Sequence, residues 1–206
     1  MTMGTVDESK LIKEFNSRLK LCSNNLICYH NVFKTTNERG YIFLIMSYIE
    51  GQELGMLKEE NKLVLTFKSL TYDEKLKITN DLVNAVETLH SIGIAHKDIR
   101  LENIIYDRRR NKATLIDYGF SCIIPKFLNN EYEVKCDTME STSFYKKLLA
   151  GKKLNWKEYD NFCLEFCLYI LWFEPKNNYF QIKNNMEKKK EEYKVVINII
   201  NKLMEL

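Results

Sequence analysis

Glycine and proline are scarce in this sequence, and long apolar runs are missing from it. The 206 residues include only 7 glycines and 2 prolines, which excludes the collagen-like and low-complexity classes. The longest apolar runs, 41–48 and 167–173, are far shorter than the roughly 18 residues of a membrane-spanning helix. The first ten residues, MTMGTVDESK, contain no apolar segment typical of a secretory signal. We therefore expect a globular, cytoplasmic protein with no membrane partner.

A strong excess of charge of one sign is missing as well. Lysine and arginine number 31 against 28 aspartates and glutamates, which gives a net charge of +3. Because nucleic-acid-binding domains usually carry a clustered basic face, we expect no nucleic-acid partner. The one basic triplet, Arg108-Arg109-Arg110, lies between the apolar segments NIIY and ATLI. This position favours a solvated hairpin tip over a binding patch.

None of the six cysteines forms a CxxC pair, and only three histidines accompany them. A zinc site is therefore not expected. Cys163 and Cys167 are four residues apart in an apolar segment, which predicts that they share the buried face of a helix. Because no export signal is recognisable, we expect all six cysteines to be reduced thiols.

The hydrophobic periodicity predicts a helix, two strands, a long helix, a short hairpin and further helices. The long helix has the clearest boundaries, because Thr71 and Glu74 form a capping box and Gly93 can end the helix in a left-handed conformation. The predicted elements are helices over 9–22, 71–91 and 156–173, a helical tail from about 187, and strands over 26–33, 41–49, 103–106 and 113–116.

The most informative segment is IAHKDIRLENIIYDRRRNKATLIDYGFS, residues 94–121. It contains His96-Lys97-Asp98, then Asn103, then Asp117-Tyr118-Gly119. These motifs resemble the H-R-D-x-x-x-x-N and D-F-G signatures of eukaryotic-type protein kinases of the serine/threonine type. Each aspartate alone could be a turn or cap residue. The ordered set, placed after a long helix, favours the functional interpretation.

The resemblance implies an α+β, protein-kinase-like fold with a reduced N-terminal sheet lobe and a mainly helical C-terminal lobe. Residues 1–49 would form the reduced lobe, from one helix and two to three strands. Residues 50–206 would form the helical lobe, with the catalytic loop and a shortened C-terminus. The family's chemistry implies ATP and Mg²⁺ as cofactors and serine or threonine hydroxyls of a protein as the substrate.

The resemblance also implies roles for individual residues. Asp98 would orient the substrate hydroxyl and accept its proton, and Arg100 would keep a positive charge near the transferred phosphate. Asn103 and Asp117 carry oxygen ligands of the kind that Mg²⁺ prefers. The remaining implied residues are Met46 as gatekeeper, the backbone of Ser47 and Ile49 at the hinge, Glu53 near the ribose, Ile105 beneath the base, and Glu14, His96 and Asp160 as structural supports. For Glu14, an exposed helix glutamate with no such role is an equally good interpretation.

Two parts of the family's phosphate-binding apparatus are missing from the sequence. No GxGxxG occurs, and no strand lysine precedes Glu14. Losing one preorganised charge contact typically costs about 3–4 kcal/mol of transition-state stabilisation. The alternatives are therefore a kinase with weak activity, a pseudokinase that acts as a binding or scaffold module, and a fragment of a longer kinase. A partner protein that covers the truncated N-terminal lobe fits the second and third alternatives.

Overall fold

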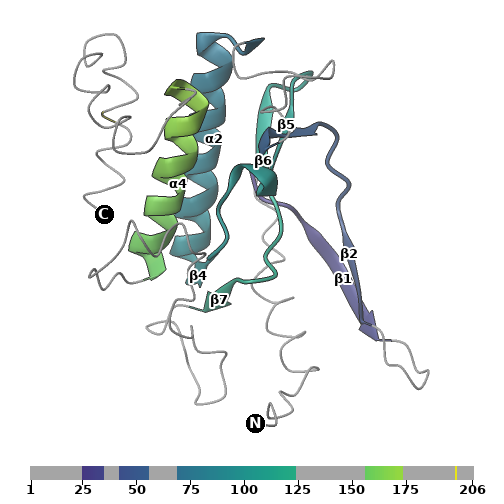
Figure 1. The fold of residues 1–206 in the computed structure, drawn as a ribbon. Helices are drawn as coiled ribbons and strands as arrows, with labels where there is room; N and C mark the ends of the chain where they lie inside the picture. Colours follow the sequence, from purple (N-terminus) through teal and green to yellow (C-terminus); the bar gives the residue numbers. More distant parts are fainter. Residues whose placement is uncertain (1–24, 35–41, 56–68, 124–155, 174–197, 199–206) are drawn as a thin grey trace.

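Two helices, one 3₁₀ turn and seven short strands form the part of the chain that the computed structural model describes, which is residues 25–34, 42–55, 69–123, 156–173 and 198. Figure 1 shows α2 and α4 side by side, the β5–β6 hairpin next to α2, and the β1–β2 ribbon extending away from the helices. The elements are β1 (Tyr29–Lys34), β2 (Ile42–Met46), β3 (Gln52–Glu53), α2 (Tyr72–Ser91), β4 (Ile94–Ala95), η3 (Leu101–Asn103), β5 (Ile104–Asp107), β6 (Lys112–Leu115), β7 (Cys122–Ile123) and α4 (Trp156–Phe173).

The described strands form three small antiparallel sheets. β1 pairs with β2 in a ribbon that contains an irregularity between Tyr29 and Asn31. β5 is the central strand of the sheet β3–β5–β6, and β4 pairs with β7. The predicted strands and the two predicted helices 71–91 and 156–173 are confirmed to within a few residues. The predicted helix 9–22 and the tail helix lie outside the described residues.

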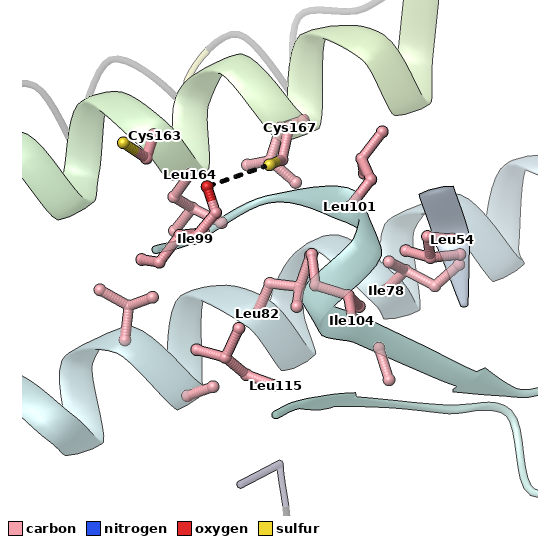
Figure 2. Close-up of a cluster of buried hydrophobic side chains, with 14 of the residues drawn as sticks. Leu54, Ile78, Leu82, Ile99, Leu101, Ile104, Leu115, Cys163, Leu164 and Cys167 are labelled. Atoms are coloured by element: carbon pink, nitrogen blue, oxygen red, sulfur yellow. Dashed lines mark hydrogen bonds between the residues drawn. The ribbon is translucent and has the colours of Figure 1, made fainter. Parts of the chain in front are cut away.

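The hydrophobic core lies between α2 and α4. The segment that leads from β4 into η3 runs through this core (Figure 2). Apolar residues at helical spacing on α2, such as Ile78 and Leu82, belong to the same cluster of buried side chains as Leu164 of α4. Ile99 and Leu101 lie between the two helices and are 2% exposed. Full burial of one such side chain contributes about 1.5–3 kcal/mol. The core therefore fixes the backbone that carries Asp98.

Two polar contacts join α2 to its neighbours inside this core. Trp172 of α4 donates its indole N–H to Thr79 Oγ1 at 2.9 Å. The buried Asp81 accepts the backbone N–H of Ala113 in β6 at 3.0 Å. Because buried polar groups are costly when unpaired, these bonds specify how α2 sits against α4 and β6.

The cysteines divide into two groups. Cys163 and Cys167 are free and buried on α4, as predicted. Cys28 and Cys122 each take part in a disulfide bond, so the expectation of six reduced thiols is wrong for these two residues. That expectation was based on an assumed reducing compartment, which carries no information about which thiols the fold brings together.

The segment that follows β2 is held closely against β5. Gly51 has φ +141°, and a Cβ atom there would lie 2.5 Å from the carbonyl oxygen of Tyr106. Only glycine allows both this backbone conformation and this approach. The close contact leads directly into the pairing of Glu53 with Ile105.

Glu74, in the first turn of α2, connects the helix start to the β5–β6 hairpin tip. Its carboxylate accepts the backbone N–H of Thr71 at 2.8 Å, and Thr71 Oγ1 accepts the N–H of Glu74, which confirms the capping box. The same carboxylate pairs with Arg108 at 2.7 Å. Burial alone would raise the pKa of Glu74, but the hydrogen bonds from Thr71 and Arg108 outweigh it, and the pKa is lowered.

The arginine triplet lies at the hairpin tip, as predicted, and each member pairs with an acidic residue. Arg109 pairs with Glu50 at 3.2 Å and Arg110 with Asp107 at 3.6 Å. All three arginine side chains remain well exposed. Exposed pairs of this kind contribute at most about 1 kcal/mol each.

Replacing Glu74 with alanine should lower the free energy of unfolding by about 1 kcal/mol, because the variant loses half of the capping box and the Arg108 pair. The lowered pKa means that this contribution is present above the ordinary value of 4.5 and is lost as the pH falls through the folded-state value. Urea denaturation should therefore show that the difference in free energy of unfolding between the wild-type protein and the variant narrows as the pH is lowered from 7 towards 4. Glu87→Ala, at an exposed position of the same helix, is the matched control and should lower the free energy of unfolding by less than Glu74→Ala at pH 7, and equal losses in the two variants would contradict the assignment.

Candidate active site

The carboxylate of Asp160 holds the loop formed by residues 96–103, which we call the catalytic loop. Asp160 lies on α4 and is 0% exposed. It accepts the backbone N–H of His96 at 2.7 Å and that of Lys97 at 2.8 Å. His90 Nε2, from the end of α2, lies 3.0 Å from the same carboxylate. A side chain from α4 thus fixes the start of the loop and joins it to α2.

His96 is buried and links the catalytic loop to the segment that contains Asp117. Its Nε2 lies 3.1 Å from the carbonyl oxygen of Ile116, and its Nδ1 accepts the backbone N–H of Asp98 at 3.3 Å. This pairing places the proton on Nε2 and leaves the ring neutral. Burial lowers the pKa of His96, although the charges of Asp160, Asp98 and Asp117 partly oppose the shift.

Asp98 and Asn103 are in direct contact across the catalytic loop. Asn103 donates its side-chain N–H₂ to the carbonyl oxygen of Asp98 and to Asp98 Oδ2, both at 2.8 Å. η3 brings Asn103 back towards Asp98, because the N–H of Asn103 donates to the carbonyl of Arg100. Arg100 Nε lies 3.6 Å from Asp98 Oδ2. The structure therefore brings together the three residues predicted to be catalytic.

Asp117 lies directly beside this group. The N–H of Ile116 donates to the carbonyl oxygen of Asn103 at 2.9 Å, and His96 contacts the Ile116 carbonyl. Asp117 has a left-handed backbone with φ 64°, and its Oδ1 accepts the N–H of Gly119 at 3.1 Å. Left-handed non-glycine residues are uncommon and often mark functional turns. The two sequence motifs thus converge at one place.

The donor set at this place suits Mg²⁺. In the described part of the chain, the Asn103 side chain makes two hydrogen bonds, and both use its Nδ2 atom. The Oδ1 atom is therefore left for a cation. Asp117 is exposed and offers a carboxylate. An amide oxygen and a carboxylate completed by phosphate oxygens are typical of Mg²⁺ sites. Within the described ranges, no group of three or more His, Cys, Asp or Glu side chains could hold a metal by itself.

Tyr118 packs in an aromatic stack that reaches from β1 to the catalytic loop. Its ring centroid lies 5.4 Å from that of Tyr29 and 5.3 Å from that of His96. Tyr118 is 2% exposed, and its buried hydroxyl has no hydrogen-bond partner in the described part of the chain. Burial raises the pKa of Tyr118 far above its ordinary value. These ring contacts connect the N-terminal ribbon to the motif residues.

The residues predicted to bind nucleotide fall into two groups. Glu53 and Ile105 are cross-strand neighbours in the β3–β5 pair. Met46 pairs with Tyr29 at the end of the β1–β2 ribbon and is 45% exposed. Ser47 follows Met46 and donates its backbone N–H to the carbonyl of Cys28 at 2.8 Å. Of the two backbone groups of Ser47, only the carbonyl is therefore available to bind the adenine base of a nucleotide.

Ile49 and Glu14 complete the predicted set. Ile49 is partly buried and packs against the main hydrophobic core, between the two groups in the sequence. Glu14 lies outside the described residues, so its predicted role as a structural support stays a prediction. His96 and Asp160, the other two predicted supports, both lie in the network described above.

Sequence reasoning missed two residues of this network, His90, which contacts Asp160, and Trp156, which contacts the catalytic loop. His90 lies four residues after Val86 on the buried face of α2, so a polar residue within an apolar stripe was the available signal. Trp156 places its ring 4.4 Å from the ammonium of Lys97, and no local pattern in the sequence indicates this contact.

Comparison with known proteins identifies the family. The family model described as "Protein kinase domain" matches residues 2–205. CBL-interacting protein kinase 3 of Oryza sativa subsp. japonica is 31% identical over 121 residues, which cover 57% of this chain and 25% of that protein. A probable serine/threonine-protein kinase KIN1 homolog of Enterocytozoon bieneusi is 32% identical over 145 residues, which cover 68% of this chain and 21% of that protein. The chain thus spans about a quarter or less of the length of these relatives.

A solved structure supports the fold. The Cydia pomonella granulovirus kinase PK-1 is similar with a TM-score of 0.57 and 24% sequence identity, over 79% of this chain and 56% of that chain. The predicted α+β, protein-kinase-like fold is therefore confirmed. None of the helices in the described ranges is long and apolar enough to cross a membrane.

Replacing Asp160 with asparagine should lower the free energy of unfolding by about 2–4 kcal/mol, because an amide N–H₂ would then face one of the donors that the carboxylate accepts. Urea denaturation followed by circular dichroism measures this change. Asp73→Asn, the same substitution at an exposed position of α2, is the matched control and should change stability by less than about 1 kcal/mol. Similar losses in both variants would show that Asp160 does not hold the loop.

Proposed function

This chain belongs to the protein kinase domain family, and on that premise we propose that it transfers the γ-phosphate of ATP to serine or threonine hydroxyls of a protein substrate. The observation that carries the proposal is the hydrogen bond between Asp98 and Asn103, made next to the segment that bears Asp117. Phosphoryl transfer depends mainly on positioning and charge neutralisation. A rigid loop with these side chains on it meets that requirement.

Asp98 orients the attacking hydroxyl and accepts its proton. Its Oδ2 is held by Asn103, so Oδ1 is the atom left for the substrate. Arg100 contacts the same carboxylate from an exposed position, where its charge can also face an incoming phosphate. The neutral ring of His96 accepts a hydrogen bond from the backbone N–H of Asp98 and so holds the backbone of this residue in place.

Asn103 Oδ1 and the Asp117 carboxylate would hold Mg²⁺. When bound, the ion neutralises negative charge on the phosphates. The left-handed turn at Asp117 presents the carboxylate to solvent, while the bond to Gly119 restricts its rotation. These two ligands come from separate segments that hydrogen bonds already hold together.

The adenosine part of ATP would lie along β3, β5 and the end of β2. Ile105 would contact the base, Glu53 the ribose, and the carbonyl of Ser47 an exocyclic amine. Met46 and Ile49 border this path. The proposed adenosine site lies at the proposed boundary between a reduced N-terminal lobe, residues 1–49, and a helical lobe, residues 50–206.

A binding or scaffold role is the second candidate function. The observation that favours it is the exposure of apolar side chains on β2 and in the linker after it. Phe43 is 48% exposed, Ile45 is 45% exposed and Tyr48 is 91% exposed. A ribbon of two strands with such side chains suits a partner protein that covers the N-terminal lobe. Partner binding in this case needs neither Asp98 nor Asp117.

Titration with Mg-ATP, with and without EDTA, tests the nucleotide site. A nucleotide that binds the native state at 100 times its Kd stabilises it by about 2.7 kcal/mol. We expect a rise in Tm that EDTA abolishes and that Asp117→Asn removes, because the variant loses a proposed metal ligand. A flat response of the wild-type protein would exclude ATP as substrate and leave the binding role.

Transfer of labelled phosphate to a generic protein substrate tests the chemistry. Asp98→Asn should lower the rate by at least about 10²-fold, because it removes the proton acceptor. Asp73→Asn, at an exposed position on α2, should leave the rate within about twofold. Equal transfer by Asp98→Asn and wild type would refute the role of Asp98. Partner capture unaffected by Asp98→Asn, with no transfer by the wild-type protein, would establish the scaffold role.

A further inference from the structure

Lys97 lies between His96 and Asp98 in an unusual backbone conformation. Its φ is 69°, in the left-handed region that a lysine adopts at a cost. This conformation turns the chain so that Asp98 faces Asn103 while the Lys97 N–H faces Asp160. The Asp160 carboxylate holds the backbone of Lys97, and a separate contact holds its side chain.

That second contact is a cation–π interaction with Trp156. The ammonium of Lys97 lies 4.4 Å from the centroid of the Trp156 ring. Tryptophan has the aromatic face that attracts cations most strongly, and 4.4 Å is well within the effective range. Trp156 is the first residue of α4, so Lys97 contacts this helix at Trp156 and again one turn later at Asp160.

The Trp156 ring is itself fixed by its neighbours. It packs edge-on against Tyr159 of the same helix, at a centroid distance of 6.1 Å. It also packs against the small buried cluster of Ala95 and Cys122, where β4 pairs with β7. A partly buried ring held by the helix and by a strand pair is a rigid surface on which a cation can rest.

We propose that Trp156 is a positioning residue for Asp98. By holding the Lys97 ammonium, it stabilises the left-handed turn that aims the Asp98 carboxylate. This role rests on the proposed function, and it acts through the charge of Lys97 rather than through packing alone. Trp156 has no contact with the reacting atoms in this role.

The charge dependence can be tested by a double-mutant cycle in kcat. Trp156→Leu and Lys97→Met should each lower kcat about three- to tenfold, with the KM for ATP changed by less than about twofold. The double variant should be no slower than either single variant, because each removes the same interaction. Lys97→Arg should retain most of the activity, since a guanidinium also stacks on an aromatic face.

Two controls separate this role from a general loss of packing. Trp156→Phe keeps an aromatic face and should lie between wild type and Trp156→Leu in kcat. Trp172→Phe removes a tryptophan from the other end of α4, together with its bond to Thr79, and should lower stability while leaving kcat within about twofold. Additive losses in the double variant, or equal loss in Trp172→Phe and Trp156→Leu, would overturn the proposal.

An NMR measurement keeps the test independent of transfer activity. In protein labelled with ¹³C-lysine, the ε-methylene protons of Lys97 should be shifted upfield by the indole ring, and Trp156→Leu should abolish that shift. The backbone amide resonance of Asp98 should move in Trp156→Leu and in Lys97→Met. If the wild-type protein transfers no phosphate, the proposed function fails but these shifts still report the positioning. Unchanged Lys97 and Asp98 resonances in Trp156→Leu would overturn the inference whatever the activity.

Discussion

The buried carboxylate of Asp160 is the constraint on which the rest of the site depends. A charge with no solvent exposure is tolerated only when several donors surround it, and here two consecutive backbone N–H groups and a histidine do so. The donors come from the catalytic loop and from the end of α2, while the acceptor comes from α4. One side chain therefore ties together the two core helices and the loop that carries Asp98.

Most local features of this architecture could be predicted from the sequence, because short-range physics determines them. Hydrophobic periodicity and a capping box set the limits of α2, and the continuous apolar pattern of YDNFCLEFCLYILWF set those of α4. The spacing of the motifs also predicted that Asp98 and Asn103 meet. Contacts between distant segments could not be predicted in this way. The Lys97–Trp156 contact and the Tyr29–Tyr118 stack follow from how the elements pack, and the disulfide-bonded state of Cys28 and Cys122 depends on tertiary placement.

The two candidate functions place different demands on the same residues. Catalysis requires Asp98, Asn103 and Asp117 to converge, and their segments are joined by hydrogen bonds through Ile116 and His96. A scaffold requires a stable frame and an exposed surface, and β2 supplies apolar side chains for one. The first demand is costly to satisfy, because it includes left-handed backbone at Asp117 and Lys97.

The hydroxyl of Tyr118 distinguishes this chain from the phenylalanine-containing form of the motif. Burial removes this oxygen from water, and no group in the described part of the chain accepts a hydrogen bond from it. The inward position of this ring is thus less favourable than the same position would be for phenylalanine, by about 1–3 kcal/mol. Since Asp117 adjoins Tyr118 in the chain, the cost of burying this hydroxyl falls on the same turn that carries the left-handed backbone of Asp117.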